Sequence, residues 1–520
     1  MERGKASASD YSNGSATFVA TAESMIAVDS AKSNHLVGVS QFIHNLDDHY
    51  RRFSSYDGAE VSMDGGTSWR DQIVPGFDCR QREAATNQTI YRTTDPVVAF
   101  DSSGKLYGVI LPVYRIGNEE HVATLYATKS TDGGVSWTIA YGGKPIFNQA
   151  DSPDKPWVIV DNSPTGPYRG TVYVVWTASY GKNGEQSAIL MSKSMDSGLT
   201  FTAPVDISPR TANITYQLAS PALEPDGTMY VNFIRTCFPC ADFDELVAKS
   251  SDGGRSFGAP VRVGTFPYYI YTNSQFRVGI PESFTINPTN GHLLLAVEKG
   301  TKMVPNVFVK IGKIQIPVSD RTDILLYESS DGGVTWNSPL TVNDNNADAN
   351  MIQPVIAASP NGVEAVAFYD RRLSCPNEPW ILPADVDRAN LCLDTSIQFF
   401  SDHGALKVIG TNIRVTNSSW DPENSGSLAP TQIPLHFIGD YFGLTVTNST
   451  AYVFYLANYN LGANPAYDTQ SFLGRIKLTL IFGNTPILNP NLAYGLAVTV
   501  LVVVIVACVY GFRRRLKVKA

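Results

Sequence analysis

The sequence is poor in charge, in histidine and in cysteine. Charged residues make up 17% of the 520 positions, and there are 7 His and 6 Cys. Basic residues number 40 against 48 acidic ones, so the formal net charge of -8 gives no general attraction for nucleic acid. A Gly-rich phosphate loop that leads from a strand into a helix is also absent. We therefore expect no nucleic-acid partner, no cofactor and no metal ion.

The abundant residues favour strands and turns. The chain has 41 Gly, 31 Pro and 25 Tyr, and 43% of its residues are hydrophobic. Gly and Pro are typical of tight turns, whereas aromatic residues are enriched in strands. The composition predicts an all-β protein with a sizeable core.

The longest hydrophobic run lies near the C-terminus. Residues 492–512, LAYGLAVTVLVVVIVACVYGF, carry no charge, and as a helix they would span about 30 Å of hydrocarbon. The β-branched run and the RRRLKVK sequence that follows argue against a buried core helix. We predict a single-pass transmembrane helix at 492–512 in the lipid bilayer, after a juxtamembrane linker at 484–491 and before a basic tail at 513–520.

The charges, the cysteine pairs and the sequons of the chain indicate how this helix is oriented in the membrane. The basic tail favours a cytoplasmic C-terminus and an extracellular domain. Residues 1–15 are predicted to be flexible, and they contain no apolar signal segment. The alternative is therefore a tail-anchored protein whose domain faces the cytosol. An extracellular domain requires a leader that the sequence does not include. The pairs Cys237/Cys240 and Cys375/Cys392 favour disulfides over a zinc site, because no His pair accompanies them. Sequons for N-glycans also suit the outside, at Asn13, Asn87, Asn213, Asn417 and Asn448.

One eight-residue pattern recurs five times. In each copy an Asp bonds backbone amides across a turn, a Gly takes positive φ, and a final aromatic residue packs between sheets. A degenerate sixth copy, FSDHGAL at 400–406, contains Asp402. The copies are SMDGGTSW at 62–69, STDGGVSW at 130–137, SMDSGLTF at 194–201, SSDGGRSF at 250–257 and SSDGGVTW at 329–336.

A two-strand unit precedes each of these turns. Two apolar runs flank Asp, Asn, Pro or Gly, as in DPVVAFDSSGKLYGVIL and QPVIAASPNGVEAVAFYD. Together the units give four strands per repeat, which is typical of a β-propeller blade. Counting the units gives seven blades over residues 16–483, with six as the alternative. We expect residues 471–478 and an early strand near 17–20 to close the ring.

The S-x-D-x-G-x-x-W turn is the Asp-box, and the chain resembles the sialidase (neuraminidase) superfamily of BNR/Asp-box propellers over about residues 16–480. The resemblance implies that the boxes lie away from the ligand and are structural. It also implies a glycan or glycoprotein ligand. Two functions fit it: an exo-sialidase type of glycoside hydrolase, or a non-catalytic cell-surface propeller that binds glycans or proteins.

Sialidase chemistry, as the resemblance implies it, uses three arginines around the substrate carboxylate, a Tyr nucleophile activated by Glu, and an Asp acid/base. The Arg-Ile-Pro element of the family is absent, and the nearest sequences are HYRRF at 49–53 and, far downstream, FRVGIPE at 276–282. This departure favours the binding alternative. The candidates are Arg235, Arg277 and Arg371 with the adjacent Arg372 as the anion clamp, Tyr441 as nucleophile, Glu282 as its base and Asp95 as acid/base.

Polar residues at the starts of the first strands give the candidate site a location. In a propeller these positions converge on one mouth of the central channel. The alternative is that they only cap backbone amides. The polar residues at these positions are Asp95, Asp154, Glu282, Gln353 and Asp440, of which Asp154 and Asp440 are candidate substrate-binding residues.

Overall fold

The computed structural model describes residues 2–5, 18–45, 53–74, 90–116, 119–122, 124–139, 144–146, 151–181, 186–237, 240–272, 274, 276–277, 280–311, 314–402, 405–424, 436–459 and 469–482. Most of these residues lie in strands and in the turns between them. The helical elements among them are short, namely η2 (Pro422–Asn424) and α1 (Thr479–Phe482). The prediction of an all-β chain is therefore confirmed for the part that the structure describes.

The strands form antiparallel sheets in chain order. The first sheet contains β2 (Phe18–Asp29), β3 (Lys32–Asn45), β4 (Phe53–Ser62) and β5 (Arg70–Ile73). The second contains β6 (Ile90–Phe100), β7 (Leu106–Ile116), β9 (Tyr126–Ser130) and β10 (Thr138–Ile139), with β8 (Glu119–Val122) beside β7. The third contains β11 (Ser152–Val160), β12 (Val172–Tyr180), β13 (Gln186–Ser194) and β14 (Val205–Asp206).

The same order continues in the second half. The fourth sheet contains β15 (Ile214–Leu223), β16 (Met229–Cys237), β17 (Asp242–Ser250) and β18 (Val261–Pro267). The fifth contains β21 (Glu282–Ile286), β22 (Leu293–Ile311) and β23 (Ile314–Ser329), and β23 also pairs with β19 (Ile270–Tyr271) and β24 (Leu340–Thr341). The sixth contains β25 (Met351–Ala358), β26 (Val363–Asp370), β27 (Asp394–Asp402) and β28 (Leu406–Arg414).

The last sheet joins the two ends of the described chain. It contains β30 (Gly443–Val446), β31 (Thr450–Ala457), β32 (Gln470–Lys477) and, outermost, β1 (Glu2–Lys5). A small parallel pair joins β20 (Phe276–Arg277) to β29 (His436–Phe437). The predicted strand at 471–478 is thus present in this sheet. Residues 18–20, which we expected beside it, lie instead in β2, where they continue the pairing with β3.

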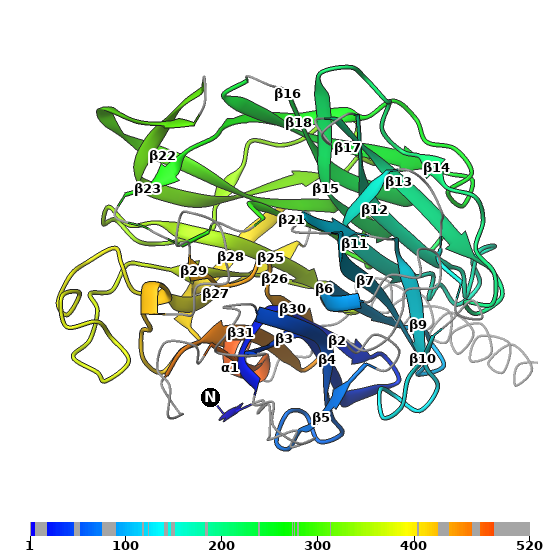
Figure 1. The fold of residues 1–520 in the computed structure, drawn as a ribbon, viewed down its shortest axis with the longest axis horizontal. Coiled ribbons are helices and arrows are strands. Elements are labelled where there is room, and N and C mark those ends of the chain that lie inside the picture. The colour runs from blue at the N-terminus through cyan, green and yellow to red at the C-terminus, as the bar shows by residue number, and fades with distance from the viewer. Residues whose placement is uncertain are drawn as a thin grey trace, which may run out of the picture.

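The first strands of the sheets surround a common centre (Figure 1). Each contacts the first strand of the next sheet, from β2 through β6, β11, β15, β21 and β25 to β30, and β30 contacts β2 again. This closed cycle of antiparallel four-stranded sheets is consistent with a β-propeller. The number of blades stays a prediction.

The first and last sheets pack against each other through a small apolar cluster, which we call the seam. It consists of Ile26, Leu36, Tyr452, Phe454 and Leu473. Gly38 of β3 allows this packing, because a Cβ built there would lie 2.6 Å from the Phe454 ring. The seam therefore depends on a close approach between residues that are far apart in sequence.

The five predicted Asp-box turns all connect the third strand of a sheet to its fourth. In the first, Asp64 Oδ1 accepts hydrogen bonds from the amides of Thr67 and Ser68, and its Oδ2 accepts one from the Ser68 hydroxyl. These bonds lower the pKa of Asp64 to about 2, with the Ser68 side chain as the largest cause. Asp132, Asp196, Asp252 and Asp331 accept equivalent bonds. Because the strands are antiparallel, these turns lie at the opposite ends of the sheets from the starts of the first strands.

Both predicted disulfides are present, whereas the predicted membrane segment lies outside the described residues. Cys237 pairs with Cys240, and Cys375 pairs with Cys392. Among the described residues no helix is both long and apolar enough to cross a bilayer. The predicted transmembrane helix at 492–512, its flanks at 484–491 and 513–520, and most of the N-terminal segment 1–15 lie outside the described residues.

Candidate functional site

Five of the seven first strands have a β-bulge near their starts, whereas β21 and β30 pair with their second strands without one. In each of the five the pairing with the second strand skips two residues, and the first of the two has positive φ. Positive φ in a residue other than Gly costs about 1–3 kcal/mol and is concentrated at functional sites. A bulge also tolerates Pro, which removes a ladder hydrogen bond. The bulged pairs are Glu23–Ser24, Asp95–Pro96, Lys155–Pro156, Leu218–Ala219 and Gln353–Pro354.

The bulges bring Lys155 into a group of carboxylates. Its Nζ lies 2.9 Å from Glu23 Oε1 and 2.5 Å from Asp440 Oδ2, and it also contacts Asp95 Oδ1. Glu23 supports the neighbouring bulge as well, because its Oε2 accepts a hydrogen bond from the Asp95 amide at 3.2 Å. The sequence suggested Asp95 and Asp440 but missed the roles of Glu23 and Lys155.

The group carries more negative than positive charge. Glu23, Asp95, Asp154 and Asp440 all act on Lys155, so four carboxylates surround one ammonium. Burial and the nearby Glu23 raise the pKa of Asp95 to about 8, although Lys155 opposes this shift. Burial likewise raises the pKa of Asp154. At neutral pH the Asp95 carboxyl therefore holds a proton beside a cationic lysine.

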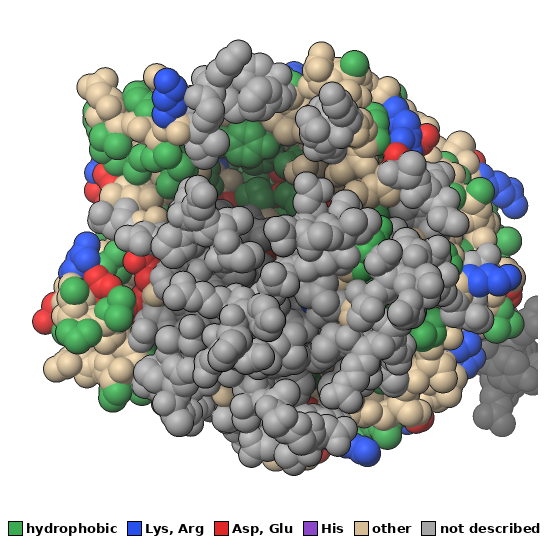
Figure 2. All heavy atoms as spheres, in the orientation of Figure 1, with side chains coloured by type: hydrophobic (Ala, Val, Ile, Leu, Met, Phe, Trp, Pro, Cys, Tyr) green, Lys and Arg blue, Asp and Glu red, His purple; other side chains and the backbone are tan. Residues whose placement is uncertain are grey.

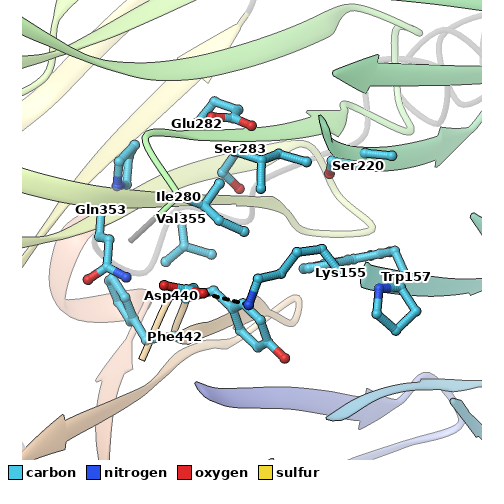
Figure 3. A pocket seen from close by; sticks show the side chains of 15 residues that line it. Lys155, Trp157, Ser220, Ile280, Glu282, Ser283, Gln353, Val355, Asp440 and Phe442 are labelled. Carbon is cyan, nitrogen blue, oxygen red and sulfur yellow. Dashed lines mark ion pairs between the residues drawn. The ribbon is translucent and has the colours of Figure 1, made fainter. Parts of the chain in front are cut away.

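A pocket with aromatic walls adjoins this group. Lys155, Trp157, Asp440 and Tyr441 line it, and Figure 3 shows the Lys155 side chain extended toward Asp440. Trp157 and Tyr441 meet edge to face with 6.1 Å between ring centroids. The face shown in Figure 2 is hollowed near its centre, where hydrophobic side chains are visible with some acidic ones.

Tyr441 is a half-buried residue in the lining of this pocket. Its hydroxyl donates a hydrogen bond of 3.2 Å to the Pro96 carbonyl. Burial, followed by repulsion from Glu23 and Asp95, raises the pKa of Tyr441 well above its usual value. Tyr441 is therefore a neutral hydroxyl that lies beside the carboxylate group.

Glu282 lines the same pocket on the other side and points away from Asp440 (Figure 3). Neither of its carboxylate oxygens has a hydrogen-bond partner among the described residues. Burial and repulsion from Glu245 raise the pKa of Glu282 well above its usual value. The charged groups that shift the pKa of Tyr441 are Glu23, Asp95, Lys155 and Asp57. Glu282 is not among them, so the structure does not bring the predicted Tyr441–Glu282 pair together.

A tyrosine–glutamate arrangement that the sequence did not reveal lies next to the pocket. Glu298 Oε1 accepts hydrogen bonds from the Tyr269 and Tyr271 hydroxyls at 2.7 and 2.5 Å. Its Oε2 accepts one from the amide of the bulged Gln353 at 3.0 Å. Burial raises the pKa of Glu298 to about 7, and these hydrogen bonds oppose the shift. Only tertiary contacts reveal this group, because its members come from β22, from β25 and from β19 with the residue before it.

Of the predicted arginine clamp, Arg235, Arg371 and Arg372 do not line the pocket. Arg371 is fully buried, and its Nη1 donates to Ser274 Oγ at 2.6 Å while its Nη2 has no partner among the described residues. Arg235 pairs with Asp244 and is 41% exposed. Arg372 bonds Asp344 at 2.5 Å and Asn412 at 2.7 Å. Arg277 belongs to β20, and its side chain lies outside the described part of the structure.

The only similarities found to known proteins are to the folds of solved structures. No family model matches the sequence, and no curated protein matches it. Similar solved structures include a Hadza microbial sialidase, at 14% identity and a TM-score of 0.43, covering 82% of this chain and 74% of that chain. Penicillium chrysogenum alpha-L-arabinanase complexed with arabinobiose shows 13% identity and a TM-score of 0.42, covering 76% and 96%.

Trypanosoma rangeli sialidase in complex with the inhibitor DANA is similar at 13% identity, with a TM-score of 0.38 and coverage of 88% of this chain. The matched region spans 55% of that sialidase, about half of its length. Identities this low concern the fold alone.

Proposed function

We propose that the pocket at the starts of the first strands is the active site of a glycoside hydrolase. The supporting observation is the buried Asp95 carboxyl, which shares the Lys155 ammonium with Asp440 and whose pKa is raised to about 8 by burial and by Glu23. Glycoside hydrolysis in general needs one carboxylic acid that protonates the leaving oxygen and one carboxylate that acts at the anomeric carbon. Asp95 suits the first role and Asp440 the second.

The spacing of the two carboxyl groups favours a retaining mechanism over an inverting one. Because Asp95 and Asp440 bind the same Nζ atom, they lie closer together than the ~6.5–9.5 Å that leaves room for a water molecule in inverting enzymes. The arrangement fits a retaining enzyme, in which the second carboxylate forms the glycosyl intermediate and Asp95 then activates water. Trp157 and Tyr441 provide apolar ring surface against which a sugar can pack.

The charge of the pocket decides between substrates. Carboxylates outnumber the cation that faces them. Arg235 and Arg372 are paired elsewhere, and Arg371 is buried. A carboxylate-bearing sugar would be repelled, so we propose neutral glycosides as the main substrates. The sialidase alternative keeps Tyr441 as nucleophile with Glu282 as its base, and it requires Arg235, Arg277 or Arg371 to reach the substrate.

A panel of fluorogenic glycosides tests this proposal. The full 520-residue chain, purified in detergent, is offered neutral α- and β-glycosides, uronides and a sialoside. We expect turnover of a neutral glycoside that Asp440→Asn abolishes and Tyr441→Phe only reduces. Turnover of the sialoside alone, lost with Tyr441→Phe, supports the sialidase alternative instead. A folded protein that cleaves nothing in the panel rules out both.

One observation favours a non-catalytic binding function as the second candidate. The Lys155 ammonium is held by three carboxylates, and it occupies the space between the two proposed catalytic groups. A glycan-binding propeller needs the aromatic walls and the polar groups but no proton donor. Saturable binding of a neutral oligosaccharide without cleavage would identify this function.

We also propose that the seven four- and five-stranded sheets are seven propeller blades of the Asp-box type. The cycle of contacts from β2 to β30 and back supports the number, and the five turns with equivalent Asp hydrogen bonds support the type. The closing blade combines β1 with β30–β32, so the two chain ends hold the ring together.

Membrane display is a further part of the proposal, with the propeller outside the cell and residues 513–520 in the cytoplasm. The uncharged run at 492–512 supports it. We expect the chain to stay in the membrane pellet after alkaline carbonate extraction, and Val503→Arg combined with Val506→Arg to release it. The matched Val503→Leu, Val506→Leu variant serves as the control. Equal release of all three proteins would contradict the anchor.

A further inference from the structure

A second polar cluster lies between the fifth and sixth sheets, at the end that carries the Asp-box turns. His292 Nδ1 lies 2.8 Å from Glu328 Oε1 and 2.6 Å from Asp402 Oδ2. These three ligand atoms all lie within 4.8 Å of one another. Glu328 and Asp402 are 6% and 8% exposed, and the His292 side chain is 22% exposed. The cluster is thus sheltered but reachable from solvent through His292.

The cluster breaks the pattern of the repeats. In the second and third sheets the residue before the box serine is a lysine, whose Nζ donates to a carbonyl in the next box. Lys129 bonds Ser197 O at 2.9 Å, and Lys193 bonds Gly253 O. In the fifth sheet the same position holds Glu328, which faces Asp402 of the next sheet. A carboxylate therefore replaces a cation at a position where the neighbouring sheet also presents a carboxylate.

A third carboxylate adds to the unbalanced charge. Glu364 is fully buried, and its Oε1 accepts a hydrogen bond of 2.6 Å from Asn287. Its Oε2 and Asp402 Oδ1 have no hydrogen-bond partner among the described residues. In the described part of the chain no Lys or Arg forms an ion pair with any of the three.

We propose that His292, Glu328 and Asp402 bind a divalent transition metal ion of the Zn²⁺ class, with Glu364 as the adjacent carboxylate. One imidazole nitrogen and carboxylate oxygens form a donor set that Zn²⁺ accepts, and an all-oxygen set would suit Ca²⁺ or Mg²⁺ better. Tetrahedral ligands at ~2.0–2.1 Å from zinc lie about 3.3 Å apart, so the side chains need to separate by less than about 1 Å from their present contacts.

The ion would connect two sheets. His292 and Glu328 belong to the β21–β22 turn and to β23, whereas Asp402 ends β27. A metal ion shared by these elements fixes the fifth sheet to the sixth and neutralises the buried carboxylates. The site lies at the opposite ends of the sheets from the Asp95 pocket, so it does not depend on the proposed glycosidase function.

Metal binding to the full chain tests the proposal. The protein in detergent is treated with EDTA, dialysed and titrated with Zn²⁺ against a chromophoric chelator. We expect one tight Zn²⁺ per chain, a rise in the unfolding temperature on binding, and a weakening of at least about 10-fold in Glu328→Gln and in Asp402→Asn. Asp29→Asn is the matched control, because Asp29 pairs with the buried His35 at 3.3 Å without a third ligand among the described residues.

Co²⁺ provides a readout that does not depend on the variants folding. Bound to the wild-type protein in place of Zn²⁺, it should give intense visible absorption that one equivalent of Zn²⁺ removes. Absence of stoichiometric Zn²⁺ and Co²⁺ binding would overturn the proposal. So would Zn²⁺ binding of unchanged affinity in both folded ligand variants, or tight binding of Ca²⁺ with no binding of Zn²⁺.

Discussion

Asp95→Asn is expected to lower kcat/KM for a neutral glycoside by about 10²–10⁴-fold, the usual contribution of a general acid. Asn has the shape of Asp but cannot supply the proton that the leaving oxygen needs. In the wild-type protein the acid is present below the pKa of Asp95, which is about 8, so kcat/KM should fall as the pH rises through that value. Initial rates over pH 5 to 10 measure both effects.

The leaving group makes this test specific. A glycoside of a strongly acidic phenol needs little protonation, so Asp95→Asn should lose much less activity with it than with an alkyl glycoside. Asp132→Asn is the control, because Asp132 belongs to an Asp-box turn on the opposite side and should leave the rates unchanged. An equal loss with both leaving groups would mean that Asp95 holds the site together and does not donate a proton.

Phe454→Ala is expected to lower the free energy of unfolding by about 3–5 kcal/mol, the usual cost of removing a buried Phe. Phe454 is fully buried in the seam, where it packs against the first sheet beside Gly38. Its loss leaves a cavity between the first and last sheets. Denaturant unfolding followed by tryptophan fluorescence measures the change.

Two comparisons separate the seam from general effects of substitution. Phe308→Ala is the surface control, because Phe308 is 54% exposed on the β22–β23 extension, and it should change stability by less than about 0.5 kcal/mol. Gly38→Val should also destabilise, since its side chain would overlap the Phe454 ring. A small effect of Phe454→Ala would show that the ring is held closed mainly by the hydrogen bonds within the last sheet.

The repeat pattern allowed much of the fold to be predicted. The Asp-box turns form through hydrogen bonds between residues at most four positions apart, so their signal is local and survives in the sequence. The hairpins and the strand at 471–478 were likewise visible as alternating apolar runs. The outer partner of that strand was not predicted, because β1 pairs with β32 across almost the whole length of the chain.

The candidate site was predictable only in part. Asp95, Asp440 and Tyr441 were placed near one another, because the starts of first strands converge in a propeller. The role of Lys155 was not predicted, since no local pattern shows that a bulge turns its side chain toward Asp440. The catalytic roles of Tyr441 and Glu282, and the roles of the four arginines, stay predictions.

By itself the sequence determined the strand-rich repeats, the turn chemistry and the uncharged C-terminal run, because each depends on residues close together along the chain. The tertiary structure decided which charges face one another. Asp95 gains its high pKa from burial and from Glu23 of another sheet, and Glu328 meets Asp402 only where two sheets touch. Such contacts depend on the closing of the ring, which no short stretch of sequence specifies.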